Sequence, residues 1–249
     1  MKISVYLDPQ RREKAGPLVR AFAAGCRARI ITTMRFDRGA QAHAFVGNWL
    51  SSQLCIPRCR EERLPYWYMD SAFIHPVSRE PRYYRLTANG LAPDLSQDRT
   101  MDRAWQLGVR LKPWRQTGKH VVLLAQGPSF GKPWGLDARG WLTKVRHILK
   151  RVTDRPVRIR EKIARESKPL SEDLRDAWAV VTHSSTAAVE AAIAGIPVFC
   201  APTCPAAVVG SLDVWQIEDP PMPDREPWIA GLAWCQWTLD EYRRGAWLG

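Results

Sequence analysis

Residues 177–199 read Ala-Trp-Ala-Val-Val-Thr-His-Ser-Ser-Thr-Ala-Ala-Val-Glu-Ala-Ala-Ile-Ala-Gly-Ile-Pro-Val-Phe, and this stretch decides the fold. Its apolar start predicts a buried strand over 177–181, and its alanine-rich centre predicts a helix that Gly195 can end. A hydroxyl residue at 184–186 can cap the helix, and a second buried strand follows Pro197. The stretch is therefore a strand–turn–helix–strand unit of an α/β protein.

The turn before this helix is a predicted anion site. The first N–H groups of a helix have no partner within it, and the helix dipole adds positive potential at the same end. The diphosphate of a nucleotide fits such a place. Glu190 lies among small residues inside the helix, where it either accepts hydrogen bonds from ribose hydroxyls or faces water.

Size and composition indicate a globular protein. The 249 residues suffice for one domain or two small ones with a proper core, and 45% apolar with 25% charged residues is typical of soluble proteins. No apolar run approaches the roughly 18 residues of a membrane span, and no N-terminal stretch resembles a signal peptide. We therefore expect a cytoplasmic protein without an integral membrane segment. The six cysteines form no Cys-x-x-Cys pair, which favours buried free thiols.

The net charge is the most telling feature of the composition. Lysine and arginine exceed aspartate and glutamate by 37 to 25, which gives +12. A field of that sign attracts polyanions such as nucleic acid or an anionic membrane, although a generally basic proteome would produce the same balance.

The order of the elements predicts two domains. A strand–helix–strand pattern over 2–33 implies a parallel sheet with a right-handed crossover. A linker-like segment at 112–119 precedes a second series that begins with an apolar strand. We expect one domain over 1–115, onto which the closing helix 238–249 packs, and another over 116–237.

Further elements are predicted from periodicity and helix breakers alone. They are a strand over 42–46, a short helix over 48–54 with a charged loop over 58–63, a long amphipathic helix over 136–152, a short helix over 203–209 and a last strand over 213–217.

In the first half, an aromatic strand over 64–69 delivers Asp70, with His75 just beyond it. Ligands of open parallel sheets bind outside the carboxyl ends of the strands, so Asp70 or His75 can act there as a general base toward an acceptor hydroxyl. Asp70 could equally cap a turn. The residues that follow would meet an acceptor or form a solvated basic face; they are Arg79, Arg82, Tyr84 and Arg85.

In the second half, three kinds of residue are candidates for donor binding. Gly127 follows the first strand and permits close backbone approach. On the strand over 157–160 the alternation sets Arg158 and Arg160 on one face, and Lys162 follows. These cations would hold phosphate charge, or they are the exposed arginines of an edge strand.

The sequence resembles a known group of enzymes at three places. Thr182-His183-Ser184-Ser185-Thr186, then Glu190-Ala191, and then Gly195-Ile196-Pro197-Val198 are similar to the donor-nucleotide segment of GT-B-type glycosyltransferases. The same segment is similar to that of UDP-N-acetylglucosamine 2-epimerases and capsule-polysaccharide transferases.

The resemblance implies a fold and a set of contacts. The fold is α/β, with two Rossmann-like parallel-sheet domains facing a cleft and a C-terminal helix crossing back to the first domain. Ser184, Ser185 and Thr186 would contact the donor phosphates, with His183 beside them, and Glu190 would contact the ribose. The chain departs from the family in having Ser185 and Thr186 in place of glycines, and His183 in place of an acidic residue.

The function implied is metal-independent sugar transfer from a nucleotide sugar, most simply a UDP-sugar, without a further cofactor. Neither the Asp-x-Asp pair of GT-A enzymes nor another metal motif occurs. The overall organisation resembles uncharacterised bacteriophage-encoded proteins, which together with the charge favours hydroxymethylated pyrimidines in DNA as the acceptor. Three alternatives stay open: transfer to a surface polysaccharide or lipid, epimerisation of the nucleotide sugar, and non-catalytic binding of nucleic acid.

Overall fold

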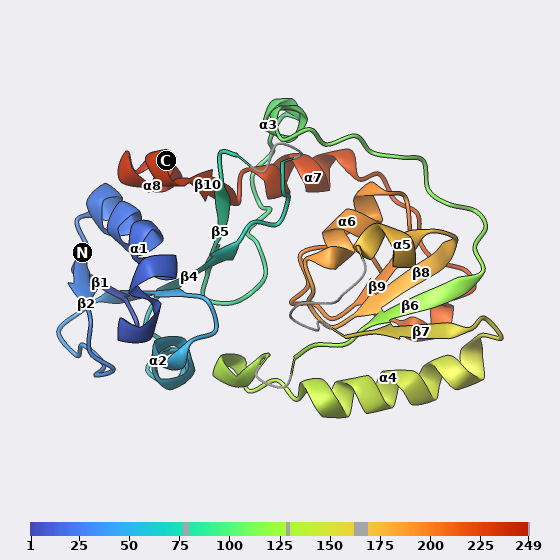
Figure 1. Ribbon diagram of the computed structural model, residues 1–249, viewed down its shortest axis with the longest axis horizontal. Coiled ribbons are helices and arrows are strands. Elements are labelled where there is room, and N and C mark those ends of the chain that lie inside the picture. The colour runs from blue at the N-terminus through green and yellow to red at the C-terminus, as the bar shows by residue number, and fades with distance from the viewer. Residues whose placement is uncertain (77–79, 128–129, 162–168, 249) are drawn as a thin grey trace. The chain divides into compact units, whose positions relative to one another are not determined.

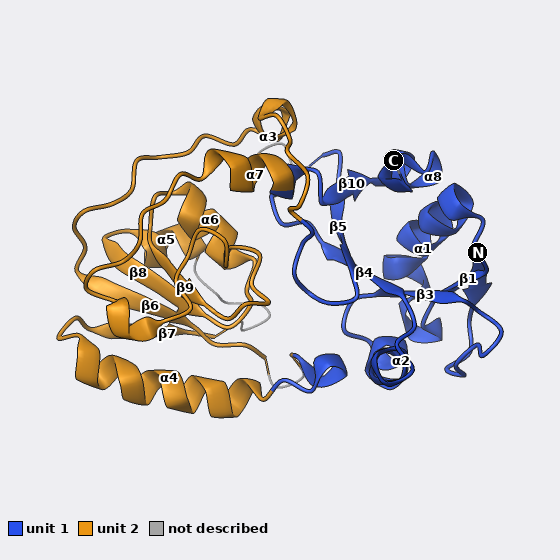
Figure 2. Cartoon of the chain, turned by 180° about the vertical axis from the view of Figure 1, so that it is seen from behind, with its two compact units in different colours: residues 1–94, 131–136, 232–249 blue, residues 95–130, 137–231 orange. Residues whose placement is uncertain are grey.

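The chain folds into two compact units, each built around its own sheet (Figure 2). The computed structural model describes residues 1–76, 80–127, 130–161 and 169–248. The first unit comprises residues 1–94, 131–136 and 232–249, and the second comprises residues 95–130 and 137–231. Residues 95–115, which the sequence grouped with the first domain, thus belong to the second unit.

The first sheet has six strands in the order β10-β5-β4-β3-β1-β2. Four of them are parallel, namely β1 (Ile3–Tyr6), β2 (Arg29–Ile31), β3 (Ala42–Val46) and β4 (Tyr66–Ser71). At the other edge, β5 (Tyr83–Ala88) and β10 (Gln236–Thr238) run antiparallel to their neighbours. The last strand of the chain therefore completes the sheet that the first strand starts.

Helices cover both faces of this sheet (Figure 1). On one face, α1 (Arg12–Cys26) and α8 (Leu239–Arg243) pack over Val5, with Phe22 and Tyr242 fully buried in the same core. On the other face, α2 (Leu50–Glu61) buries Ile56. The 3-10 turns η1 (Pro9–Arg11), η2 (Lys132–Trp134) and η4 (Ala246–Leu248) complete the unit. The C-terminal helix thus returns to the first unit, as predicted.

The length of α2 corrects the sequence analysis. A short helix over 48–54 and a charged loop over 58–63 were expected, but one helix runs from Leu50 to Glu61 with Pro57 inside it. Proline normally breaks a helix because it removes one backbone hydrogen bond and crowds the preceding turn. Here burial of Cys55, Ile56 and Cys59 on the sheet outweighs that cost.

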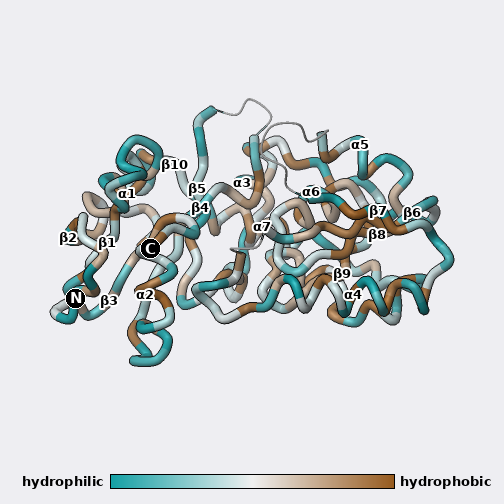
Figure 3. The backbone as a smooth tube through the Cα atoms, turned by 60° about the horizontal axis from the view of Figure 1, so that its bottom comes forward, coloured by the Kyte–Doolittle hydropathy of each residue, from teal (hydrophilic) through white to brown (hydrophobic). Residues whose placement is uncertain are grey.

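The second sheet is the buried parallel sheet predicted from residues 177–199. Its order is β7-β6-β8-β9, and all neighbours are parallel. The strands are β6 (His120–Leu124), β7 (Val157–Arg160), β8 (Ala177–Thr182) and β9 (Val198–Cys200). Every residue of β6, β8 and β9 is buried, and these strands form the brown, apolar centre of the unit in Figure 3. Near-continuous apolar runs are expected for strands covered on both faces.

Helices lie on both sides of this sheet as well (Figure 1). The long helix α4 (Ala138–Val152) covers one face and buries Val145 and Leu149 against Val121 and Val181. The helices α5 (Leu170–Leu174) and α6 (Ala187–Ile193) cover the other face. Two further helices are α3 (Asp102–Gln106) and α7 (Glu226–Ala233).

Two short elements of the second unit differ from the prediction. Residues 203–209 form successive turns rather than a helix. Residues 213–217 contain the 3-10 turn η3 (Val214–Gln216) rather than a strand, because the carboxylate of Asp213 accepts a hydrogen bond from Trp215 N at 3.0 Å and starts a turn. Within the described residues, no helix has the length and apolar character to cross a membrane.

Candidate functional site

The candidate donor site lies at the carboxyl edge of the second sheet. The register pairs Leu124 of β6 with Thr182 of β8, and Thr182 with Cys200 of β9. Because the strands are parallel, the loops after these three residues emerge at one edge, which is where open α/β sheets bind ligands. A hydrogen bond of 3.0 Å from Ala201 N to the carbonyl of His183 ties two of the loops together.

Two backbone N–H groups converge on one oxygen at this edge. The side-chain amide of Gln126 faces Ser184 N at 3.2 Å and Ser185 N at 3.0 Å, and because both neighbours are donors its oxygen is assigned to that position, where it accepts from both. Paired N–H groups of this kind form a nest that stabilises an anionic oxygen. The turn thus presents a pair of aimed donors that a neutral side chain from the loop after β6 occupies, and binding of an anion there stays a prediction.

The hydroxyl groups of the turn serve the protein itself. The Ser184 hydroxyl is buried and forms a short hydrogen bond with the Thr203 hydroxyl. The Ser185 hydroxyl accepts from Ala187 N at 3.2 Å and so caps α6, whereas Thr186 at the N-cap position makes no side-chain cap bond. The structure therefore offers the N–H groups of Ser184 and Ser185, rather than the Ser184 hydroxyl, to an anion.

His183 fixes the shape of the turn. Its ring is 8% exposed and lies edge-on to Phe130, 5.9 Å between centroids, and to Trp141 at 5.4 Å. Burial lowers the pKa of the imidazole, so it is neutral at neutral pH. Its Nδ1 lies 2.8 Å from the Ser184 hydroxyl. His183 therefore holds Ser184 in place and brings no positive charge to the site.

Glu190 lies on the exposed side of α6, whose opposite side buries Ala188, Val189, Ala191 and Ala192. Its carboxylate is therefore exposed about one helical turn into α6, the helix that directly follows residues 183–186. Its expected contact with ribose stays a prediction.

The basic residues of the second unit are divided between two places. Arg160 ends β7 beside Leu124, at the edge of the candidate site, and its guanidinium group forms an ion pair with Asp173 of α5. Arg158 instead lines a pocket with Lys119 and His120, at the opposite, amino end of β6. The structure therefore does not bring Arg158 together with the turn. Gly127 is exposed, and a β-carbon added there would meet no atom within 4 Å. Lys162 lies outside the described residues.

In the first unit, the candidate base Asp70 is held by three hydrogen bonds at the end of β4. Its carboxylate accepts from Arg85 Nη2 at 3.1 Å, from the Tyr68 hydroxyl at 3.0 Å and from Ser71 N at 2.8 Å. The Asp70 side chain is 37% exposed and the Arg85 side chain only 11%. The carboxylate is therefore oriented and accessible, while its cationic partner is almost covered.

The other residues predicted for the acceptor lie around this pair or beyond it. Arg85 binds Asp70 rather than standing free for an acceptor, and its guanidinium carbon lies 5.6 Å from the centroid of the Tyr68 ring. Arg82 is exposed and sits 5.9 Å from the centroid of the Tyr84 ring. His75 is exposed after β4. Arg79 lies outside the described residues.

Sequence reasoning missed two residues that shape the donor site, Gln126 and Thr203. The sequence places Gln126 beside Gly127 in the loop after a strand, and nothing in it indicates that the Gln126 side chain reaches the turn after a different strand. Thr203 was read as part of a helix. Among the described residues, no three histidine, cysteine, aspartate or glutamate side chains gather as a metal site would require.

Comparison with known proteins establishes the fold. No family model matches the sequence, and no curated protein matches it. A solved structure of the Thermosulfurimonas dismutans KpsC beta Kdo 2,4 transferase is similar with a TM-score of 0.57 at 16% identity, covering 96% of this chain and 92% of that chain. The KpsC beta Kdo 2,7 transferase of the same organism gives a TM-score of 0.56 at 12% identity, covering 100% and 99%. The predicted fold class, α/β with two GT-B-like Rossmann units, is confirmed. The comparisons support neither a similarity to epimerases nor a bacteriophage source.

Proposed function

We propose that the protein is a glycosyltransferase that takes a sugar from a nucleotide donor and attaches it to a hydroxyl group of a carbohydrate acceptor. The observation that carries the proposal is the convergence of Ser184 N and Ser185 N on a single acceptor oxygen at the carboxyl edge of the second sheet. The fold is shared with two sugar transferases, which supports the same class of reaction.

In this proposal a phosphate oxygen of the donor replaces the Gln126 amide oxygen. The leaving nucleotide gains negative charge as the bond to the anomeric carbon breaks, and the two N–H groups stabilise that charge because they are already oriented. The neutral His183 keeps the turn rigid through Ser184. No metal ion is needed for this role, and a UDP-sugar is the simplest donor.

Asp70 is the proposed general base. Its carboxylate takes the proton of the acceptor hydroxyl while that oxygen forms the new bond to the anomeric carbon. The bonds from Arg85, Tyr68 and Ser71 fix the orientation of this carboxylate.

The acceptor is proposed to be a carbohydrate because both structural neighbours are described as Kdo transferases. Hydroxymethylated DNA, which the sequence favoured, is supported only by the net charge of +12. Incubation with a panel of UDP-sugars and nucleotide-activated Kdo, with either oligosaccharides or hydroxymethylcytosine DNA, separates the two acceptors by which one gains mass. Conversion of the donor without any acceptor would identify an epimerase, and binding of DNA without nucleotide binding would identify a non-catalytic protein.

Substitutions of Gln126 test the donor site directly. In Gln126→Glu the carboxylate forms charge-assisted hydrogen bonds with both N–H groups and repels phosphate, so we expect the affinity for UDP to fall at least about tenfold. In Gln126→Ala the competitor is gone, so the affinity is expected to rise about fivefold, in line with one net hydrogen bond of ~1 kcal/mol. Titration calorimetry with UDP, CMP and pyrophosphate measures both.

The matched control is Gln116→Glu, which places the same charge change on an exposed glutamine. Equal affinities in Gln126→Glu, Gln126→Ala and the control would place the nucleotide elsewhere.

Substitution of Glu190 tests the ribose contact. Glu190→Ala is expected to weaken UDP binding by about 10- to 100-fold, because a hydrogen bond with a charged partner contributes about 1.5 to 3 kcal/mol. Pyrophosphate binding should not change, and 2′,3′-dideoxy-UDP should bind the variant and the wild type equally. Glu13→Ala, an exposed glutamate of α1, is the control. A Glu190→Ala variant that still prefers UDP over its dideoxy form would contradict the assignment.

A further inference from the structure

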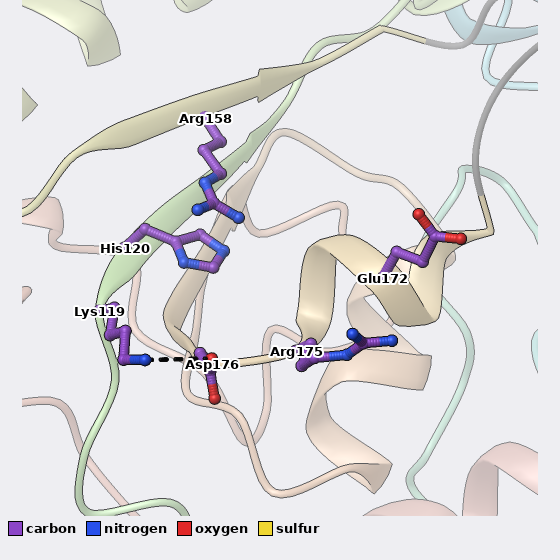
Figure 4. Close-up of a pocket in the computed structure, with 6 residues that line it drawn as sticks. All are labelled: Lys119, His120, Arg158, Glu172, Arg175 and Asp176. Atoms are coloured by element: carbon purple, nitrogen blue, oxygen red, sulfur yellow. Dashed lines mark hydrogen bonds and ion pairs between the residues drawn. The ribbon is translucent and has the colours of Figure 1, made fainter.

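A second basic pocket lies at the amino end of the second sheet, opposite the candidate donor turn. Its volume is about 460 Å³, and it is lined by Lys119, His120, Arg158, Glu172, Arg175 and Asp176. Lys119 and His120 start β6, and Asp176 directly precedes β8. Because β6 and β8 run parallel, their amino ends share this edge, while residues 183–186 emerge at the other. Figure 4 shows the six side chains around the pocket.

Two arginines supply positive charge that the described chain does not neutralise. Within the described residues, neither the guanidinium group of Arg158 nor that of Arg175 forms an ion pair or a side-chain hydrogen bond. Lys119 pairs with Asp176 at 3.5 Å, but these side chains are 81% and 57% exposed, so the pair is weak. Glu172 extends from α5 away from His120 (Figure 4). The pocket therefore has an excess of cationic donors suited to an anion.

His120 contributes a buried hydrogen-bond acceptor to the pocket. The residue is 1% exposed, and its Nε2 donates to the carbonyl oxygen of Asp173 at 2.9 Å. A carbonyl can only accept, so in the neutral ring the proton is on Nε2 and Nδ1 carries a lone pair. This Nδ1 is buried and has no hydrogen-bond partner among the residues that the structure describes. Buried acceptors are nearly always paired, so an unpaired one in a pocket wall points to a donor brought by a ligand.

We propose that this pocket binds inorganic phosphate as the hydrogenphosphate ion, HPO4²⁻. An anionic oxygen accepts from Arg158, and the P–OH group donates to Nδ1 of His120. The Arg158 side chain is exposed and points toward His120, whereas that of Arg175 points away from His120 and contributes only its positive charge (Figure 4). Sulfate has the same shape but no proton at neutral pH, so it satisfies Arg158 and leaves Nδ1 unpaired. The pocket therefore selects phosphate over sulfate.

The test compares the two anions at equal ionic strength. Titrations of the full chain with inorganic phosphate and sulfate are expected to show phosphate binding about fivefold to tenfold more tightly than sulfate. Glucose 1-phosphate, a monoester that has largely lost this proton at neutral pH, should bind like sulfate. Arg158→Gln should weaken phosphate binding about tenfold, and Arg175→Gln, which removes positive charge without removing a direct contact, should weaken it less. Arg146→Gln, an exposed arginine of α4 outside the pocket, is the control.

His120→Gln isolates the acceptor. The Gln amide nitrogen can take over the bond to the Asp173 carbonyl while the Nδ1 lone pair is lost, so the variant should bind phosphate and sulfate alike. Equal binding of phosphate and sulfate by the wild type would overturn the role of His120. Undetectable phosphate binding, or binding that Arg158→Gln leaves intact, would overturn the site.

A second phosphate site at the donor turn would confuse these titrations, and Gln126→Glu removes that ambiguity. Phosphate binding that persists in Gln126→Glu and disappears on adding Arg158→Gln belongs to the pocket. Phosphate binding that disappears in Gln126→Glu alone belongs to the turn and counts against the pocket. The outcome does not depend on whether the protein transfers sugar.

Discussion

Replacing Asp70 with asparagine is expected to lower the rate of sugar transfer by about 10²- to 10⁴-fold, the usual contribution of a general base. Asparagine keeps the size of the side chain, and its one oxygen can replace Oδ2, which accepts from the Tyr68 hydroxyl, while the bond from Ser71 N to Oδ1 is lost. It loses the negative charge that takes up the acceptor proton. Turnover of the donor and acceptor pair found in the panel gives the rate, and calorimetry with UDP should show unchanged donor affinity.

The control for Asp70→Asn must separate chemistry from stability. Asp70→Asn removes the charge partner of the nearly covered Arg85, so some loss of stability accompanies it. Asp37→Asn makes the same change in the first unit, where the carboxylate accepts from the Ser4 hydroxyl at 2.8 Å. We expect Asp37→Asn to lower the melting temperature and leave the rate unchanged. A full transfer rate in Asp70→Asn would move the role to another group, and His75→Ala would then be the next variant.

Replacing Gly195 with alanine is expected to destabilise the second unit by about 2 to 5 kcal/mol. Two costs add: Gly195 has φ +77°, where a side chain costs about 1 to 2 kcal/mol, and overpacking against fixed atoms costs about 1 to 3 kcal/mol more. The added β-carbon would lie 2.0 Å from the carbonyl oxygen of Pro113. The segment around Pro113 is itself tied down, because Arg115 N donates to the Gly195 carbonyl at 2.7 Å.

Gly135→Ala separates the two costs. Gly135 has φ +70°, but a β-carbon there would meet no atom within 4 Å. This variant should lose only about 1 to 2 kcal/mol. Thermal or urea unfolding measures both variants, with roughly 2 to 4 °C expected per kcal/mol for a chain of this size. Equal losses in the two variants would show that the contact with Pro113 is relieved by a backbone shift.

The sequence predicted the local features of the second unit well. The strand before the turn, the alanine-rich helix and its glycine stop all depend on neighbouring residues, and β8, α6 and Gly195 are found as expected. The return of the C-terminal helix to the first unit was also predicted, from the resemblance rather than from local pattern.

Features set by tertiary packing were not predictable in the same way. Pro57 indicated a break, yet α2 continues because its apolar side is buried on the first sheet. Alternation on β7 predicted that Arg158 and Arg160 share a face. It did not predict that Arg158 lines a pocket while Arg160 forms an ion pair with Asp173. The position of the Arg160 guanidinium group depends on Asp173 of α5, which lies in a different element.

The contact made by Gln126 was unpredictable for the same reason. A single sequence contains no signal that a loop glutamine after β6 will bind two N–H groups after β8. The position of the two aimed N–H groups was therefore predictable from helix physics, whereas the side chain that occupies them was not.

The antiparallel pairing of β10 with β5 has a consequence for synthesis on the ribosome. Strand β10 completes the first sheet and helix α8 packs on it, yet both are translated after nearly all of the second unit. Domains usually fold in the order in which they emerge. Here the nascent amino-terminal half has to wait with the edge of β5 uncovered, so the second unit is expected to gain protease resistance first in arrested nascent chains.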